Sequence, residues 1–580
     1  MVYIKDPRQN QLFDPFEHLF SPLAHKAIAN GWQGVFRHVI LELLPAGAVA
    51  GEFHPAMGRP TKELYSMAGL LFIMEFNHWS KEEAAQAYMF HSDLWYALNL
   101  EPGLNSLSTR TIERYQEIFR DNELAKEVMH EVTLRLVEIL EQDLSKQRLD
   151  STHVFSDMAT FGRTRMMGVT IKRFLTQVKR HDNEAFESLP EALRTRYRLS
   201  AHQLFGDTAK DKESRRLLRQ QVAEDMYALV TRFGDEERFN GRSTFKALCT
   251  VFGQQCEVIE DKVEVKAKTG GAVVQNPADP DATYDGHKGP GYQAQISETC
   301  SEENEVQLVT AAIPQTACES DADVVEEVRE ELKESELLPG EMLADTLYGS
   351  DENVQASAED DMELVSPVSG KTPGGEAMTI GDFDVDDGTE EVQTCPAGHT
   401  PISSEHDPET GKSRTEMPPD VCGDCPDKER CPVKQTRTGC HFEHTAKQRR
   451  LDQRRRTEAT DEFRERYKKR AGIEGTNSGI KRRTGMSRLR VRGKKSVFHA
   501  ILLKIAGWNI FQATRSEKMR KHVIEEMGKQ PQKGHDAIFL HAVAKYLNIS
   551  MRHRWQETVF PIRNEPRSQD SSLHRLLCAA

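Results

Sequence analysis

The chain has 580 residues, which is long enough for two to four domains with separate hydrophobic cores. Its longest apolar run, near residues 70–74, is far too short to span a bilayer, which argues against a membrane protein. No charged start followed by an apolar stretch marks a signal peptide, so we expect a soluble, cytoplasmic protein. In that compartment the ten cysteines are expected to be free thiols or metal ligands rather than disulfides.

The net charge of -14 argues by itself against a nucleic-acid partner, but its distribution points the other way. Residues 428–495 carry 23 Lys and Arg against 8 Asp and Glu, whereas residues 301–393 are rich in Asp and Glu. Such asymmetry is typical of a polyanion-binding face on an acidic protein. The alternative is a solvated helical surface. We predict that the basic stretch binds DNA or RNA.

Residues 1–145 are expected to form a mainly helical N-terminal domain. Apolar residues at 68–74 and an amphipathic pattern at 81–88 indicate two helices. Residues 107–115 place Ser and Thr before a third helix. Short helices with a positive helix start are consistent with a DNA-binding module. A purely structural helical cap fits the same pattern.

The middle of the chain alternates strands and helices. A strand is predicted at 147–155, a helical insert at 160–250, and a hairpin whose strands start near Tyr292 and Val306. A helix then precedes a short strand at 341–345. Basic helical residues follow from about Lys447, and a last helix contains Val497, Ile501, Ile505 and Trp508 on one face.

This element order predicts an α/β fold with a ribonuclease-H-like catalytic core interrupted by two insertions. The expected boundaries are 1–145 for the N-terminal domain and 146–350 for the first part of the core. An insertion with the cysteine cluster spans 351–445, the core ends with 446–515, and 516–580 form a C-terminal tail.

Two aspartates stand at strand positions where metal ligands are useful. Asp150 lies within a predicted strand and Asp345 at the end of another. An Asp within an apolar strand is disfavoured, so it needs a reason. Paired metal ions that cleave phosphodiesters need carboxylates on rigid elements, and Mg²⁺ prefers hard oxygen ligands. A chain with 91 acidic residues offers many such pairs by chance, so the pair alone is weak evidence.

A second pattern adds context to this pair. It consists of Tyr467, Arg470, Glu474 and Lys481. Seven residues are nearly two helical turns, so these four side chains are predicted on one helix face, which suits a metal beside a phosphate backbone. The alternative is an ordinary helix with surface salt bridges. Gly475 and Gly479 each weaken a helix by roughly 1 kcal/mol, and they suggest a break after Glu474.

The pattern Tyr-x2-Arg-x3-Glu-x6-Lys resembles the signature of DDE transposases of the bacterial insertion-sequence-4 superfamily. The chain most resembles the insertion-sequence-1182 family, in motifs that span well over half of it. They are GRPTKELYSMAGLLF from Gly58, LDSTHVFSDMA around Asp150, PDATYDGHKGPGYQAQI around Asp281, LADTLYG around Asp345, the cysteine segment, and the signature with GMSRLRVRGKKSV.

This resemblance implies that Asp150, Asp345 and Glu474 bind Mg²⁺ or Mn²⁺ on a ribonuclease-H-like core. It also implies that Tyr467, Arg470 and Lys481 contact the transposon end. The implied reaction is hydrolysis at each end of the element, followed by attack of the freed 3′-hydroxyl on target DNA. We expect a homo-oligomer on DNA.

Other acidic and histidine residues near these motifs are left out of the site. Asp279, Asp281 and Asp285 lie in a Gly- and Pro-rich loop and are predicted to be turn residues. His153 and His287 are interpreted as structural.

Five of the ten cysteines fall within residues 395–440. Two ligands separated by two residues suit one tetrahedral zinc, so we predict a site of Cys395, Cys422, Cys425 and Cys431. The reserve ligands are Cys440, His399 and His441. The alternatives are scattered free thiols, or a redox CxxC that lacks its usual βαβ context. The segment is interpreted as an inserted, zinc-stabilised subdomain outside the chemistry.

The sequence therefore predicts a DNA transposase. One rival is a zinc-containing DNA-binding regulator without catalysis, which has no need for an intact carboxylate triad. The other rival is a structure-specific nuclease that cuts DNA without joining it.

Overall fold

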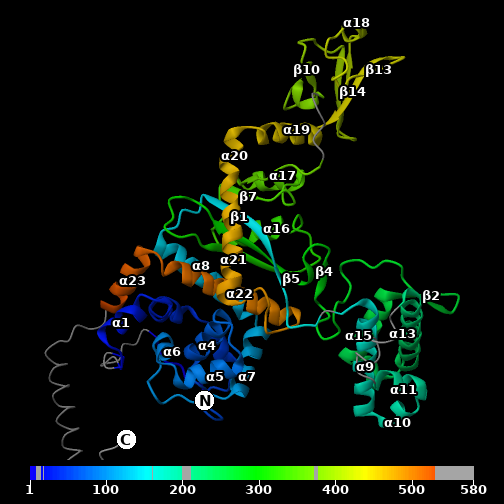
Figure 1. Cartoon of the computed structure of the whole chain (residues 1–580). Helices are drawn as coiled ribbons and strands as arrows, with labels where there is room; N and C mark the ends of the chain where they lie inside the picture. Colours follow the sequence, from blue (N-terminus) through cyan, green and yellow to red (C-terminus); the bar gives the residue numbers. More distant parts are fainter. Residues whose placement is uncertain (8–14, 17–18, 160, 199–210, 371–376, 529–580) are drawn as a thin grey trace, which may run out of the picture.

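The computed structural model describes residues 1–7, 15–16, 19–159, 161–198, 211–370 and 377–528. Figure 1 shows a helical N-terminal part, a central α/β core, a helical insert beside it, and a small β-rich part at the far end. Within these ranges, no helix is both long and apolar enough to cross a membrane.

The N-terminal part is helical, as predicted, and packs around the buried α4. Its elements are α1 (Pro22–Ala29), α2 (Trp32–Val35), η1 (Phe36–Ile40), η2 (Leu41–Leu43), α3 (Ala46–Gly51), α4 (Leu64–Phe76), α5 (Lys81–Phe90), α6 (Ser92–Ala97), α7 (Thr109–Asp121) and α8 (Leu124–Leu140). Ser80 and Glu83 form a capping box that starts α5, and the Ser108 side chain caps α7.

The central sheet has the strand order β6-β5-β1-β7-β8. Its strands are β1 (Lys146–Val154), β5 (Gly289–Thr299), β6 (Val309–Thr316), β7 (Glu341–Ala344) and β8 (Glu363–Val365), and β4 (Thr283–Asp285) pairs with the start of β5. β5 is antiparallel to β1 and β6, whereas β7 is parallel to β1 and β8. This arrangement fits the predicted ribonuclease-H-like core. The predicted strands are confirmed, although β6 begins at Val309 and not near Val306.

Helices cover both faces of this sheet. Leu149, Ile313 and Met342 pack with α16 (Val325–Glu334) and α17 (Asp351–Glu359) on one face. The other face is covered by α20 (Asp461–Tyr467), η4 (Lys468–Ala471), α21 (Gly472–Thr484) and α22 (Lys494–Ala513), and α23 (Glu517–Gly528) follows. In Figure 1, α20 and α21 form a column along the sheet. This column carries the second half of the candidate site.

Two segments are inserted into this core. The first comprises α9 (Arg163–His181), α10 (Asn183–Glu187), α11 (Glu191–Arg198), α13 (Lys212–Phe233), α14 (Glu237–Asn240), α15 (Ser243–Gln255), β2 (Cys256–Ile259) and β3 (Lys262–Val265). It has its own core around Phe174 and Phe233. The predicted helical insert is therefore present, and its last helix extends to Gln255.

The second insertion is small and rich in strands. It comprises η3 (Ile380–Asp382), β9 (Asp384–Val385), β10 (Val392–Thr394), β11 (Ser403–Asp407), β12 (Lys412–Met417), α18 (Pro419–Gly423), β13 (Lys434–Thr436) and β14 (Gly439–Thr445). Helix α19 (Ala446–Glu458) leads back to the core. The apolar core of the second insertion is small and lies around Phe383 and Phe442. A part with so little buried apolar surface needs another source of stability.

A buried lysine connects the N-terminal helices to the column of α20 and α21. The Nζ of Lys504 on α22 donates hydrogen bonds to the carbonyls of Glu75 at 2.6 Å and Thr484 at 2.8 Å. It also pairs with the Glu75 carboxylate at 3.3 Å. Helices α4, α21 and α22 are thereby fixed to one another, which holds α21 against the sheet.

Candidate active site

Three carboxylates from three separate elements meet at one arginine. The Nη2 of Arg470 donates a hydrogen bond to Oδ1 of Asp150 at 2.9 Å and lies 3.7 Å from Oδ2 of Asp345. Its Nη1 donates to Oε1 of Glu474 at 3.3 Å. The structure thus brings together all three residues that the sequence predicted as a triad. It also places the predicted DNA-contacting Arg470 between them.

The sheet register sets the two aspartates side by side. Leu149 and Ala344 are partners in the parallel β1–β7 pair, so Asp150 and Asp345 follow at adjacent positions. Asp345 stands just past the end of β7, where its Oδ1 accepts the amide N–H of Leu347 at 2.8 Å. The carboxyl end of a parallel strand is a common place for functional side chains.

A buried ion pair docks the helical column next to these aspartates. Arg148 on β1 pairs with the fully buried Glu298 on β5 at 2.6 Å, and its Nη1 donates to the Lys469 carbonyl at 2.9 Å. The Thr476 hydroxyl on α21 donates to the same Glu298 at 2.6 Å. Position 472 requires glycine, because a Cβ there would overlap the Arg148 guanidinium. This pair therefore fixes the start of α21 over the sheet.

The electrostatics of Asp150 reflect its position under the column. Burial raises the pKa of the Asp150 carboxyl, the charge of Arg470 works against this rise, and the neighbouring Asp345 adds to it. The Asn477 amide donates to Oδ2 of Asp150 at 3.1 Å. Asp150 is therefore a fixed carboxylate with both oxygens engaged. Asp345 and Glu474 have more freedom, since their side chains are 41% and 68% exposed.

The cluster has the ligand chemistry of a divalent-cation site, but its present geometry is that of an arginine site. Within the described ranges, no group of three or more Asp, Glu, His or Cys side chains is arranged to hold a metal ion. The guanidinium of Arg470 lies between the carboxylates and neutralises part of their charge. The donors are all carboxylate oxygens, which Mg²⁺ and Mn²⁺ prefer. The residues fit such ions once Arg470 moves aside.

The prediction that the four signature residues share one helix face is wrong. Tyr467 ends α20, Arg470 lies in the 3-10 turn η4, and Glu474 and Lys481 lie in α21. The Tyr467 hydroxyl donates to the Ala344 carbonyl at 3.2 Å, and its ring stacks on Phe463. Tyr467 thus supports the end of β7. The tighter turn aims Arg470 at the aspartates.

The expected helix break after Glu474 is also absent. Helix α21 continues to Thr484 in spite of its glycines. A Cβ at Gly479 would overlap the indole of Trp508, so this glycine lets α21 approach α22 closely. Packing against α22 compensates for the weak helix propensity.

Two lysines lie close enough to Asp150 to interact with its charge. Lys288, in the β4–β5 turn, donates to the Ser151 hydroxyl at 2.8 Å and lies 3.9 Å from Asp321. The half-buried Lys481 has no ion pair or hydrogen bond to any described residue. Burial and the charge of Lys288 lower the pKa of Lys481, and Asp150 raises it. Sequence reasoning missed Lys288, although the motif DGHKGPGYQ contained it.

The predicted turn aspartates have structural partners. Asp285 accepts the amide of His287 in the β4–β5 turn. Asp279 is buried and accepts the hydroxyls of Ser156 and Tyr292, both at 2.6 Å. Asp281 accepts the Lys494 amide at 3.1 Å at the start of α22. His153 is half-buried beside Pro290, and none of these residues reaches the Arg470 cluster.

The basic stretch, residues 428–495, divides into two parts that differ in their ion pairs. Its first half is neutralised by the acidic segment before it. The ion pairs are Lys447–Glu352, Arg449–Glu390, Arg449–Asp387, Arg450–Asp351, Arg456–Asp382, Arg466–Glu341 and Arg466–Glu363. The second half is different: Arg482, Arg488, Arg492 and Lys495 are exposed and have no ion pair with any described residue. The DNA-binding prediction therefore narrows to residues 481–495.

These exposed cations lie on a segment that runs beside the chain just past the end of β1. Phe155, just past β1, pairs with Arg488, and the Leu489 amide donates to the Phe155 carbonyl at 2.8 Å. The Asp157 amide also donates a hydrogen bond, to the Val491 carbonyl at 2.8 Å. Residues 485–495 thus continue the line of β1 beyond Asp150.

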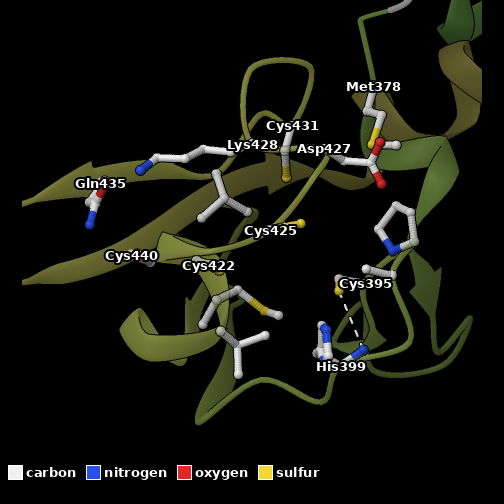
Figure 2. Close-up of a pocket in the computed structure, with 15 residues that line it drawn as sticks. Met378, Cys395, His399, Cys422, Cys425, Asp427, Lys428, Cys431, Gln435 and Cys440 are labelled. Carbon is white, nitrogen blue, oxygen red and sulfur yellow. Dashed lines mark hydrogen bonds between the residues drawn. The ribbon is translucent and has the colours of Figure 1, made fainter.

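Five cysteines line one pocket of about 240 Å³ in the second insertion. They are Cys395, Cys422, Cys425, Cys431 and Cys440, and His399 also lines the pocket. Figure 2 shows the sulfurs of Cys395, Cys425 and Cys431 facing the same space. His441, which was predicted as a reserve zinc ligand, is not among the residues that line this pocket. Burial, followed by repulsion from Cys440, raises the pKa of the Cys422 thiol to about 11.

One comparison with known proteins identifies a domain in this chain. Residues 394–514 match a family model described as a transposase DDE domain. This segment includes the pocket cysteines and Glu474 but neither Asp150 nor Asp345. No curated protein matches the chain.

Among solved structures, the chain is similar to a piggyBac transposase synaptic complex with hairpin DNA, determined by cryo-EM. The sequences are 11% identical, with 79% of this chain and 87% of that chain covered. The TM-score is 0.22, too low to support any conclusion about fold or function.

Proposed function

We propose that this protein is a DNA transposase of the DDE type. The observation that carries the proposal is the meeting of Asp150, Asp345 and Glu474 on Arg470, at the interior strands β1 and β7 of a ribonuclease-H-like sheet. The transposase DDE domain match over the segment with Glu474 supports it. The resemblance to the insertion-sequence-1182 family remains a prediction.

In this proposal the three carboxylates would hold Mg²⁺ or Mn²⁺ while DNA is bound. When bound, such ions activate the attacking oxygen and stabilise the leaving oxygen in phosphodiester cleavage. Asp150 is held in place by Asn477, so it serves as the rigid member of the set. Arg470 keeps the carboxylates from repelling one another before DNA and metal arrive. It can then turn its guanidinium toward a phosphate, which it suits geometrically.

The substrate would be the ends of the mobile element and target DNA. Lys288 and Lys481 lie near Asp150, and the exposed cations of residues 481–495 lie on a segment that contacts the chain just past β1. A duplex entering along this line meets positive charge first and carboxylates at the reaction centre. We also expect the protein to act in the cytoplasm, as a homo-oligomer that pairs two DNA ends.

The two rival functions make different demands on these residues. A DNA-binding regulator does not need three carboxylates on one cation. A nuclease needs them but does not join DNA. A donor plasmid with a marker between the element's ends, and the protein supplied in trans, tests the proposal in cells. Transfer of the marker to a target plasmid supports it, whereas binding or nicking without transfer favours a rival.

Replacing Lys481 with alanine should slow DNA end cleavage by about 100-fold, because a small misplacement of the reacting phosphate has an effect of this order. The melting temperature should not change, since Lys481 has no ion pair to lose. The matched control is Lys468→Ala, which removes an exposed lysine paired with Glu465. Equal cleavage rates for the two variants in a labelled-end assay would show that generic charge, and not this position, matters.

We also propose that the cysteine pocket binds a structural zinc ion. Four thiolates are enough for a tetrahedral zinc site, and Cys395, Cys422, Cys425 and Cys431 remain the predicted set. Their side chains are not arranged around one ion in this structure, so zinc binding would have to draw them together. The small apolar core of this insertion supports the proposal, since binding energy at such a site stabilises the fold.

Protein purified without chelators should contain about one zinc per chain. The Cys422→Ser, Cys425→Ser double variant should lose it, and residues 395–440 should become sensitive to protease. A matched control is Cys249→Ser with Cys318→Ser, two half-exposed thiols outside the pocket. Elemental analysis measures the metal directly. Zinc-free wild-type protein, or equal zinc in both double variants, would refute the proposal.

A further inference from the structure

A second basic site lies far from the carboxylates along the chain, in the N-terminal helices. A pocket of about 730 Å³ opens between the loop before α4 and the start of α7. Four cations line it, Arg59, Lys62, Arg110 and Arg114, and no carboxylate does. This composition is unexpected in a chain of net charge -14.

No described residue forms an ion pair with the cations of this pocket. Arg59 and Arg110 are exposed and make no ion pair or hydrogen bond with any described residue. Lys62 contacts only the Ser106 hydroxyl, at 3.3 Å, and Arg114 lies over the Phe53 ring. The carboxylates next to them in sequence are engaged elsewhere. Glu63 caps α4, and Glu113 pairs with Lys81.

The start of α7 adds to the positive potential. The helix begins inside the pocket, at the Ser108 cap, and has no acidic residue in its first turn. Arg110 lies in that first turn, where a cation is unfavourable unless an anion is nearby. Backbone N–H groups at a helix start, together with Arg and Lys, form a common phosphate site.

A buried polar group also faces this pocket without a matching partner. Tyr115 lines the pocket and is only 2% exposed. Its hydroxyl lies near Thr61 and the Lys62 backbone, but it makes no hydrogen bond of ordinary geometry. A buried hydroxyl without a partner is costly, so a ligand that reached it would supply a missing hydrogen-bond partner.

Two ion pairs connect this pocket to the cations beside the active site. Arg490, in the basic loop after α21, pairs with Glu83 on α5 at 3.1 Å. Lys81, at the start of α5, pairs with Glu113 on α7. Helices α5 and α7 pack side by side (Figure 1). Helix α5 thus lies between the pocket at α7 and the loop that carries Arg490.

We infer that this pocket binds the phosphodiester backbone of duplex DNA as a second anchoring site. The inference rests on the proposed function, because it assumes that DNA is the substrate. The hydroxyls of Ser106, Ser108 and Thr111 and the four cations are suited to phosphate oxygens. Phosphate contacts carry no sequence information, so we expect binding at this site to be independent of sequence.

The test compares DNA affinity across a salt series for the full chain. The variant is Arg59→Gln with Arg110→Gln, and the probe is a fluorescently labelled duplex of random sequence. Each lost phosphate contact lowers the slope of log affinity against log salt by about 0.9, so we expect a slope smaller by about 2. Affinity at low salt should fall roughly tenfold. Arg59→Lys with Arg110→Lys should retain the slope.

The matched control is Arg216→Gln with Arg414→Gln, which removes two exposed arginines from the two insertions. Its slope should equal that of the wild type. If the wild type binds the duplex and the pocket variant has the same slope, the second anchoring site is refuted and the proposed function stands. If the wild type does not bind the duplex at any salt concentration, the proposed function fails, and this inference fails with it.

Discussion

Replacing Asp150 with alanine is expected to lower the rate of DNA end cleavage by about 1,000-fold or more. The reason is that Asp150 is the rigid member of the carboxylate set, held by Arg470 and Asn477. Loss of several kcal/mol of transition-state stabilisation corresponds to a rate change of this order. End binding should be largely retained, because the cations that face DNA are unchanged.

Asp345→Ala and Glu474→Ala are expected to abolish cleavage in the same way. The matched control is Glu465→Ala, an exposed carboxylate on α20 that pairs only with Lys468. Circular dichroism and melting temperature establish that each variant is folded. Cleavage close to the wild-type rate in Mg²⁺ or Mn²⁺ by any of the three would remove that residue from the site.

Arg470→Ala is expected to produce the second large effect, and it acts on stability as well as activity. Without the guanidinium, the buried Asp150 and its neighbour Asp345 face each other with no cation between them. Removing one partner of such a pair costs about 3 kcal/mol, so metal-free protein should melt at a lower temperature. Cleavage should slow by about 100-fold, because a phosphate contact is also lost.

Divalent metal should reverse part of this loss of stability. Mg²⁺ or Mn²⁺ takes over the neutralising role of Arg470, so it should raise the melting temperature of Arg470→Ala more than that of the wild type. Arg470→Lys should restore activity only in part, because lysine cannot make the forked contact. The measurement is thermal unfolding with and without metal. Identical metal effects on variant and wild type would contradict a shared binding place for the metal and the guanidinium.

The strands and their aspartates could be predicted from sequence because the relevant signals are local. Alternating apolar residues and turn residues identified β1, the β5–β6 hairpin and β7. Asp150 and Asp345 then appeared as acidic residues at strand positions that disfavour them. Their adjacency depends on the parallel register of β1 and β7, which no local pattern contains.

The docking of the helical column could not be predicted, because it depends on contacts between distant segments. Arg148 and Glu298 are 150 residues apart, and each resembles an ordinary strand charge in the sequence. Arg148 lies two residues before Asp150 and thus on the same face of β1, which was the one available clue. Gly479 suggested a helix break until the Trp508 ring was placed against it.

The uneven charge distribution along the chain also reflects contacts between segments that are distant in sequence. The acidic segment around residues 341–390 neutralises the basic helices α19 and α20. A large part of the basic stretch is therefore structural, and the net charge says little about DNA binding. Among the described residues, Arg482, Arg488, Arg492 and Lys495 have no ion pair, and neither do Arg59 and Arg110 in the pocket before α7.

The most direct test of the central claim is a joining assay with a labelled transposon end and a supercoiled target plasmid. The wild type with Mg²⁺ should give a covalently joined product that disappears with chelator or with Asp150→Ala. The carboxylate cluster then acts in both cutting and joining. If the wild type binds the end but neither cuts nor joins it in Mg²⁺ or Mn²⁺, the protein is not a transposase of this type.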